Sequence, residues 1–230
     1  MALARSGLAV ALSGRNAGAL ADVRDEILSF GGRAIAAPLD VADAESTPEV
    51  IAQIESELGT ITVAVFCAGM NVPDRHWGTL DMADFQQIVN TNLVAVARGT
   101  DAVLPGMRAA GGGQIVVISS WAGWTHARGA GVAYSASKTG LSALVETLND
   151  HEGVHGIRGT HLCPGDVNTP FIDRRPVVPA AADRETMLSP DDVARAVLFV
   201  VESPAHVCIN ELVITPTDNR SYLRPPTPAP

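Results

Sequence analysis

Tyr134 and Lys138 lie four residues apart in a stretch whose pattern predicts a helix. At that spacing the two side chains share one helix face, with their β-carbons about 5–6 Å apart. A free tyrosine has a pKa of about 10, and a neighbouring cation favours the phenolate and lowers that value. The pair can therefore act as a general acid and base, although a solvated helix face would show the same spacing.

Two predicted strands bring further groups towards this pair. Residues 113–120 read as a buried strand that is rich in β-branched side chains and has Ser120 at its carboxyl end. Residues 157–162 read as another strand, and the Pro164-Gly165 turn follows it. Open α/β sheets bind ligands outside the carboxyl ends of their strands. We therefore expect the serine, the tyrosine and lysine pair and the turn to line one crevice.

Six short motifs follow one another along the chain in an order that resembles the short-chain dehydrogenase/reductase family. They are Leu39-Asp40-Val41, Cys67-Ala68-Gly69, Asn92-Leu93, Ile118-Ser119-Ser120, Tyr134-x-x-x-Lys138 and Pro164-Gly165-x-Val167-x-Thr169-Pro170. The resemblance runs nearly from end to end. It implies a Rossmann-like fold and a nicotinamide cofactor.

The resemblance also implies roles for four catalytic residues. Tyr134 would carry the proton, and Lys138 would lower its pKa and bind the nicotinamide ribose. Ser120 would orient the substrate carbonyl, with Ser119 as the alternative one residue earlier. Asn92 would distort its helix and hold a water that leads to the lysine; the alternative is a polar residue that faces solvent.

The same resemblance implies the cofactor-binding residues. They are Arg15, Asp40, Val41, Cys67, Ala68, Gly69, Tyr134, Lys138, Pro164, Gly165, Val167 and Thr169. Gly14 leaves no carboxylate for an adenosine ribose at the end of its predicted strand, and Arg15 could meet a 2′-phosphate. This favours NADP, with NAD as the alternative, unless Arg15 is only a surface residue in a turn. No metal site is expected.

Composition excludes several other classes of protein. The chain has 230 residues and a net charge of −9, which argues against binding to nucleic acid or anionic lipid. No apolar run approaches the roughly 20 residues of a membrane span. The three cysteines have neither zinc-type spacing nor an even count, so a reduced, cytoplasmic setting is the default.

The remaining pattern predicts strands that alternate with helices, and hence a single α/β domain with a doubly wound parallel sheet. Strands are expected at residues 8–13, 33–39, 61–68 and 209–214, besides the two named above. Helices are expected at 17–30, 48–58, 82–108 and from the Ser189-Pro190 cap to about residue 202. We predict a dehydrogenase-like domain over residues 1–217 and a flexible, proline-rich tail over 218–230.

One part of the family pattern is missing. An ordinary member begins with a strand and a Thr-Gly-x-x-x-Gly-x-Gly loop whose amides hold the cofactor pyrophosphate. Residues 13–20 could be that loop, but Leu20 occupies the last glycine position, and the chain up to Cys67 would then be about 30 residues short. We expect an amino-terminally truncated domain in which strands 8–13 and 61–68 face each other across a gap. Such a chain should bind NADPH at least about a hundredfold more weakly than one with that segment.

The sequence thus predicts an NADP-dependent oxidoreductase that interconverts a secondary alcohol and a ketone. The closing strand, residues 208–217, resembles a subgroup acting on 3-hydroxy acids, and Arg174 and Arg175 would attract an acidic substrate or be solvated. A non-catalytic relic that serves as a binding or scaffold protein is the alternative. A sugar-nucleotide epimerase is disfavoured, because little chain follows residue 214. By resemblance, the helices near Met82 and Tyr134 would form a homodimer or homotetramer.

Overall fold

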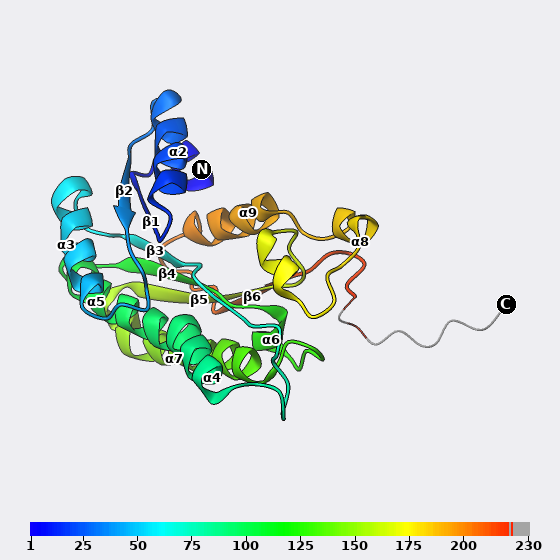
Figure 1. The fold of residues 1–230 in the computed structure, drawn as a ribbon. Helices are drawn as coiled ribbons and strands as arrows, with labels where there is room; N and C mark the ends of the chain where they lie inside the picture. The colour runs from blue at the N-terminus through cyan, green and yellow to red at the C-terminus, as the bar shows by residue number, and fades with distance from the viewer. Residues whose placement is uncertain (221, 223–230) are drawn as a thin grey trace.

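Four parallel strands form the sheet that positions the site, in the order β3-β4-β5-β6 (Figure 1). The computed structural model describes residues 1–220 and 222. The strands are β3 Val63–Phe66, β4 Gly113–Ile118, β5 Ile157–Pro164 and β6 Glu211–Ile214. The predicted parallel α/β fold is confirmed, and each predicted strand lies within two or three residues of its expected bounds.

Helices cover both faces of this sheet, as its alternating apolar side chains require. Ile115 and Val117 of β4 pack with Val103 and Leu141 on one face, whereas Val116 packs with Val197 on the other. Figure 1 shows the corresponding helices on opposite sides of the sheet. On the first side lie α4 Met82–Val89, α5 Ala95–Ala109 and α7 Val132–Glu152, and on the second lies α9 Pro190–Val201.

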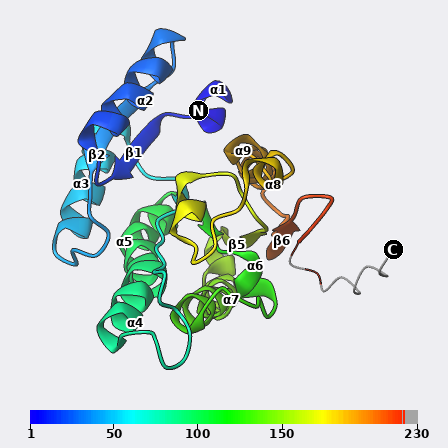
Figure 2. The ribbon, with the colours of Figure 1, turned by 45° about the vertical axis from the view of Figure 1, so that its right-hand side comes forward.

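Strands β1 (Val10–Gly14) and β2 (Ala34–Pro38) form a separate two-stranded parallel sheet. Their hydrophobic cluster also includes Ala4 and Ile27 and is distinct from the clusters of the larger sheet. The chain around this unit forms α1 Ala2–Arg5, α2 Ala17–Ser29 and α3 Ser46–Leu58. Figure 2 shows β1 and β2 standing apart from β5 and β6.

A cavity of about 1470 Å³ separates the two sheets and continues to the carboxyl ends of β4 and β5. Val10 and Leu12 of β1 line it on one side, and Val63 and Val65 of β3 line it on the other. In the described chain β1 pairs with β2 and β3 pairs with β4, so the facing edges are not joined. The expected gap between these two strands is therefore present, and the strands do not close up across it.

The helices agree with the predicted ones in part. Ser189 and Asp192 form a capping box at the start of α9, as the Ser189-Pro190 pair predicted. The single helix expected over residues 82–108 is instead interrupted by a π-helical turn, Asn90–Val94. Three short helices and a helical turn escaped prediction: α6 Trp121–Trp124, η2 Gly153–His155, η3 Pro170–Arg174 and α8 Ala181–Glu185.

The start of the segment expected to be a tail packs against the domain. Arg220 forms an ion pair with Asp183 at 3.1 Å, and the Tyr222 ring lies edge-on to Trp121, with centroids 5.2 Å apart. The rest of the predicted tail, residues 221 and 223–230, lies outside the described residues. Within the described part of the chain, none of the helices is long and apolar enough to span a bilayer.

Candidate active site

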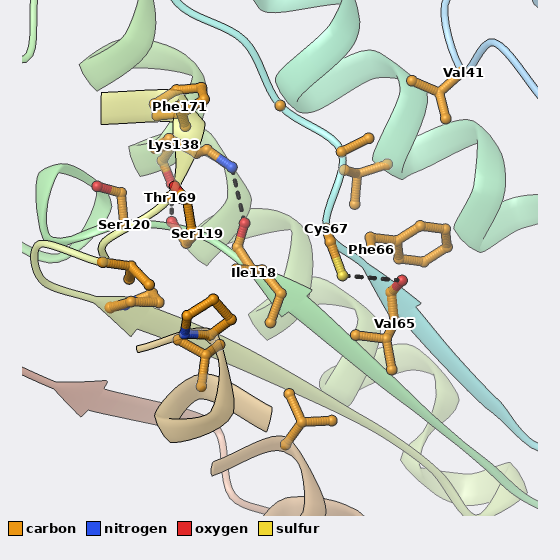
Figure 3. Close-up of a pocket in the computed structure, with 18 of the residues that line it drawn as sticks. Val41, Val65, Phe66, Cys67, Ile118, Ser119, Ser120, Lys138, Thr169 and Phe171 are labelled. Atoms are coloured by element: carbon orange, nitrogen blue, oxygen red, sulfur yellow. Dashed lines mark hydrogen bonds between the residues drawn. The ribbon is translucent and has the colours of Figure 1, made fainter. Parts of the chain in front are cut away.

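Lys138 lies at the bottom of the cavity, where α7 crosses the end of β4 (Figure 3). Only 3% of the residue is exposed, and its Nζ donates to the carbonyl oxygen of Ile118 at 2.8 Å. Burial lowers the pKa of Lys138 to about 8, although nearby Cys67 and Cys163 act in the opposite direction. The ammonium group is therefore less firmly protonated than that of a free lysine.

Tyr134 lines the same cavity one helical turn earlier, and its ring packs at 6.0 Å from that of Phe171. Burial raises the pKa of its phenol, while a hydrogen bond with Ser120 and the charges of Arg175 and Arg75 act to lower it. The nitrogen Nζ of Lys138 lies 5.9 Å from the ring centroid. Arg75 and Arg175 thus add positive charge around the phenol, besides the lysine that the spacing placed near it.

The two candidate serines are distinguished by where their hydroxyl groups lie. Ser120 lines the cavity as the N-cap of α6, and its Oγ accepts from the backbone N–H of Ala122 at 3.2 Å. Ser119 is 5% exposed, and its hydroxyl donates to the carbonyl of Lys138 at 3.1 Å. Ser120 is therefore the residue that interacts with Tyr134, whereas Ser119 joins β4 to α7.

Asn92 is fully buried at the centre of the π-helical turn, and the expected helix distortion is present there. Its carboxamide accepts from the backbone N–H of Met70 at 2.7 Å and donates to the Met70 carbonyl at 3.0 Å and to Ser137 Oγ at 3.2 Å. A Cβ built on Gly69 would lie 3.5 Å from both Asn92 Oδ1 and Lys138 Nζ. The asparagine is thus a structural bridge that holds the loop after β3 beside the lysine.

Most of the predicted cofactor residues line this cavity. They are Val41, Cys67, Ala68, Gly69, Tyr134, Lys138, Pro164, Gly165, Val167 and Thr169. Asp40 and Arg15 are exposed and lie outside the lining, and Asp40 accepts from the backbone N–H of Ala42 at 3.0 Å. The cavity end that holds Tyr134, Lys138 and Gly69 fits the nicotinamide and ribose of an NAD(P) molecule. Where the cavity passes between the facing edges of β1 and β3, the described residues supply no glycine-rich loop for the pyrophosphate.

The residues around the mouth of the cavity were only partly predicted. Trp121, the residue after Ser120, is buried and lines the cavity, whereas the nearby Trp124 and His126 do not line it. Arg174 and Arg175 both line it, and Arg175 forms a two-bond ion pair with Asp166. Sequence reasoning missed Arg75, because nothing in its polar segment indicates that this arginine is buried.

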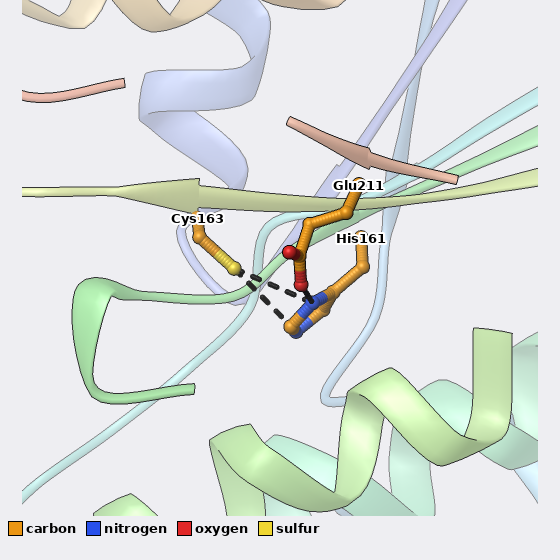
Figure 4. A group of neighbouring side chains, drawn as sticks. All are labelled: His161, Cys163 and Glu211. Carbon is orange, nitrogen blue, oxygen red and sulfur yellow. Dashed lines mark hydrogen bonds and ion pairs between the residues drawn. The ribbon is translucent and has the colours of Figure 1, made fainter. Parts of the chain in front are cut away.

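A second polar cluster lies beside β5 and β6 (Figure 4). His161 Nδ1 lies 3.2 Å from Glu211 Oε2, and the Sγ of Cys163 lies 3.4 and 3.7 Å from the two ring nitrogens. Their possible ligand atoms lie within 4.8 Å of one another, so the structure gathers metal-ligating residue types that the cysteine spacing did not indicate. Burial, and then the charge of Glu211, raises the pKa of Cys163 to about 12. The thiol is thus protonated and can donate to the ring of His161.

Known proteins resemble the chain along most of its length. An alcohol dehydrogenase from the archaeon Thermococcus sibiricus, solved with 5-hydroxy-NADP, shares 29% identity at a TM-score of 0.84, covering 97% of this chain and 91% of that one. Sulfoacetaldehyde reductase 2 from Chromohalobacter salexigens is 32% identical over 93% of this chain and 86% of its own length. Glycine betaine reductase ATRR from Emericella nidulans is 31% identical over 94% of this chain, which spans only 17% of that protein.

The family pattern described as short chain dehydrogenase matches residues 1–176. That range contains all four predicted catalytic residues, which the fold brings to one end of the sheet. The chain therefore belongs to the short-chain dehydrogenase/reductase family of NAD(P)-dependent oxidoreductases.

Proposed function

We propose that the protein uses NADP to interconvert a secondary alcohol and a ketone, with a 3-hydroxy acid as the candidate alcohol. The observation that carries the proposal is that Ser120, Tyr134 and Lys138 line one cavity at the carboxyl ends of the strands. The archaeal alcohol dehydrogenase solved with an NADP derivative supports the choice of chemistry and of cofactor.

Each side chain has a role that follows from its contacts. Ser120 donates to the substrate oxygen and fixes it beside Tyr134, which gives a proton to that oxygen in reduction and takes one in oxidation. Lys138 is a buried cation near this proton donor and stabilises the phenolate that forms. Asn92 holds the loop after β3 in place beside the lysine. The nicotinamide, when bound, supplies or accepts the hydride.

The test of this proposal uses the two tyrosines of the chain. Tyr134→Phe should reduce NADPH-dependent turnover of a panel of ketones by about two to four orders of magnitude. Tyr222→Phe is the matched control and should leave turnover within about twofold, because Tyr222 packs edge-on against Trp121. Undiminished turnover in Tyr134→Phe would refute the assigned role of the phenol.

The preference for NADP over NAD is assigned to Arg15, which follows β1 and is exposed. A guanidinium at this position can pair with a 2′-phosphate, which NAD lacks. Arg15→Gln should raise the Kd of NADPH about tenfold and leave that of NADH unchanged. An equal effect on both cofactors would mean that Arg15 does not read the phosphate.

The alternative is a non-catalytic protein, and the unjoined edges of β1 and β3 favour it. The described residues that line that gap form no glycine-rich loop for a pyrophosphate, so binding of NADPH would be weak. Wild-type protein without measurable NADPH binding or turnover would support this alternative. We further propose that the protein is cytoplasmic and forms a homodimer or homotetramer through α4, α5 and α7. Analytical ultracentrifugation would measure this oligomeric state.

A further inference from the structure

Arg75 is a buried cation in the irregular segment between β3 and α4. Its Nε donates to the carbonyl of Val72 at 2.6 Å, and its Nη2 donates to the carbonyl of Arg174 at 2.7 Å. Only 5% of the residue is exposed. The loop before α7 packs over it, because a Cβ built on Gly131 would lie 2.6 Å from the Cβ of Arg75. The fold therefore holds this guanidinium in one place.

Arg75 has no carboxylate partner within the part of the chain that the structure describes. The charged groups that act on it are the Arg175 guanidinium, which is a second cation, and the Tyr134 phenol. In contrast, Arg108 pairs with Glu152 and Arg175 pairs with Asp166. Burial of a charge is costly unless an opposite charge compensates it. A fixed, buried and uncompensated guanidinium is a suitable binding group for an anion.

The position of Arg75 connects such an anion to the reaction. Arg75 lines the same cavity as Ser120 and Tyr134, and its charge is one of those that act on the phenol. Arg175 lines this cavity too, but Asp166 already neutralises it through two hydrogen bonds. Arg75 is therefore the stronger of the two anion-binding candidates.

We infer that Arg75 binds the carboxylate of the substrate while the alcohol or ketone carbon of the same molecule lies at Ser120 and Tyr134. The inference rests on the proposed function and narrows the substrate class to short hydroxy acids and the matching keto acids. Arginine has five N–H donors, and two of those of Arg75 are used by the backbone. The remaining donors suit a carboxylate, which the planar guanidinium binds through paired hydrogen bonds.

The test compares two probes of nearly equal shape, 3-hydroxybutyrate and 3-hydroxybutyramide, which differ in charge. Calorimetric titration, with and without NADP⁺, should show that the wild-type protein binds the acid at least about tenfold more tightly. Arg75→Gln should reduce this ratio to about one. Arg128→Gln, which removes an exposed arginine that lines the same cavity, is the matched control and should keep the wild-type ratio.

A wild-type ratio near one, or an unchanged ratio in Arg75→Gln, would overturn the inference. Should circular dichroism show that Arg75→Gln does not fold, the wild-type ratio still decides, and Arg75→Lys should retain a preference for the acid. Because binding is measured without turnover, the two proposals can fail separately. Acid preference without NADPH-dependent turnover would reject the oxidoreductase, and turnover without acid preference would reject the role of Arg75.

Discussion

The carboxamide of Asn92 bonds to both backbone groups of Met70, accepting from the N–H at 2.7 Å and donating to the carbonyl at 3.0 Å. The two residues come from the π-helical turn and from the loop after β3, so this contact ties the helical layer to the sheet. The contact forms near Lys138, because a Cβ built on Gly69 would lie 3.5 Å from both Asn92 Oδ1 and Lys138 Nζ.

Replacing Asn92 with alanine should therefore destabilise the protein. The change leaves the two Met70 backbone groups without these partners, which costs about 2–4 kcal/mol in the free energy of unfolding. Asn90→Ala is the matched control, because Asn90 is exposed in the same turn, and it should change stability by less than about 0.5 kcal/mol. Urea unfolding of both variants measures the effect, and equal stabilities would contradict the bridging role.

The depressed pKa of Lys138 predicts a specific dependence of stability on pH. Its pKa is 10.5 in the unfolded chain and about 8 in the fold, so the unfolded chain binds more protons between these values. Stability therefore rises with pH in that window and carries the full burial cost below about pH 8. Lys138→Met, which cannot titrate, should gain up to about 3 kcal/mol over wild type near pH 7. That gain should shrink towards pH 10, and a gain independent of pH would refute the shifted pKa.

Cysteine labelling should report on the cofactor site. Cys67 is accessible at the cavity, Cys208 is accessible elsewhere, and Cys163 is buried. Bound NADP⁺ should slow the alkylation of Cys67 severalfold in a Cys208→Ser protein. In the matched Cys67→Ser protein, labelling of Cys208 should not respond to NADP⁺. Slowing in both variants would indicate a general change in the fold instead of coverage of Cys67.

Gly123 is packed where no side chain fits. A Cβ at this position would meet Ser119 Oγ and lie 2.7 Å from the carbonyl oxygen of Lys138. Gly123→Ala should therefore push α6 away from α7, cost about 1–3 kcal/mol and lower turnover by displacing Ser120. A Cβ at Gly153 would meet no atom within 4 Å, so Gly153→Ala should be neutral or stabilising by up to about 1 kcal/mol. Thermal unfolding compares the two, and equal melting temperatures would refute the packing argument.

The strands and the grouping of Ser120, Tyr134 and Lys138 in one cavity could be predicted because their signals are local. A β-branched run such as residues 113–118 indicates a buried parallel strand from its own composition. Because Ser120 follows this run, it lies at the carboxyl end of the strand, where such sheets bind ligands. The tyrosine and lysine share a helix face by spacing alone. Even the gap between β1 and β3 followed from counting the residues between motifs.

The electrostatics of the site could not be predicted in this way. Burial raises the pKa of Tyr134 and lowers that of Lys138, and burial depends on packing from several elements. Arg75 reads as an ordinary polar residue, and only the fold reveals that its charge is enclosed. The contact that excludes a side chain at Gly123 is equally invisible in sequence.

The separate cluster around β1 and β2 has a consequence for cooperativity. Ile27 and Ala34 pack with Ala4 instead of with the core of the larger sheet, and no strand pairing joins the two sheets in the described chain. Segments that share few contacts open independently, with their own free energies. Native-state hydrogen exchange should therefore reveal two foldons, in which the amides of residues 10–38 exchange by subglobal opening and those of β4 and β5 exchange only by global unfolding.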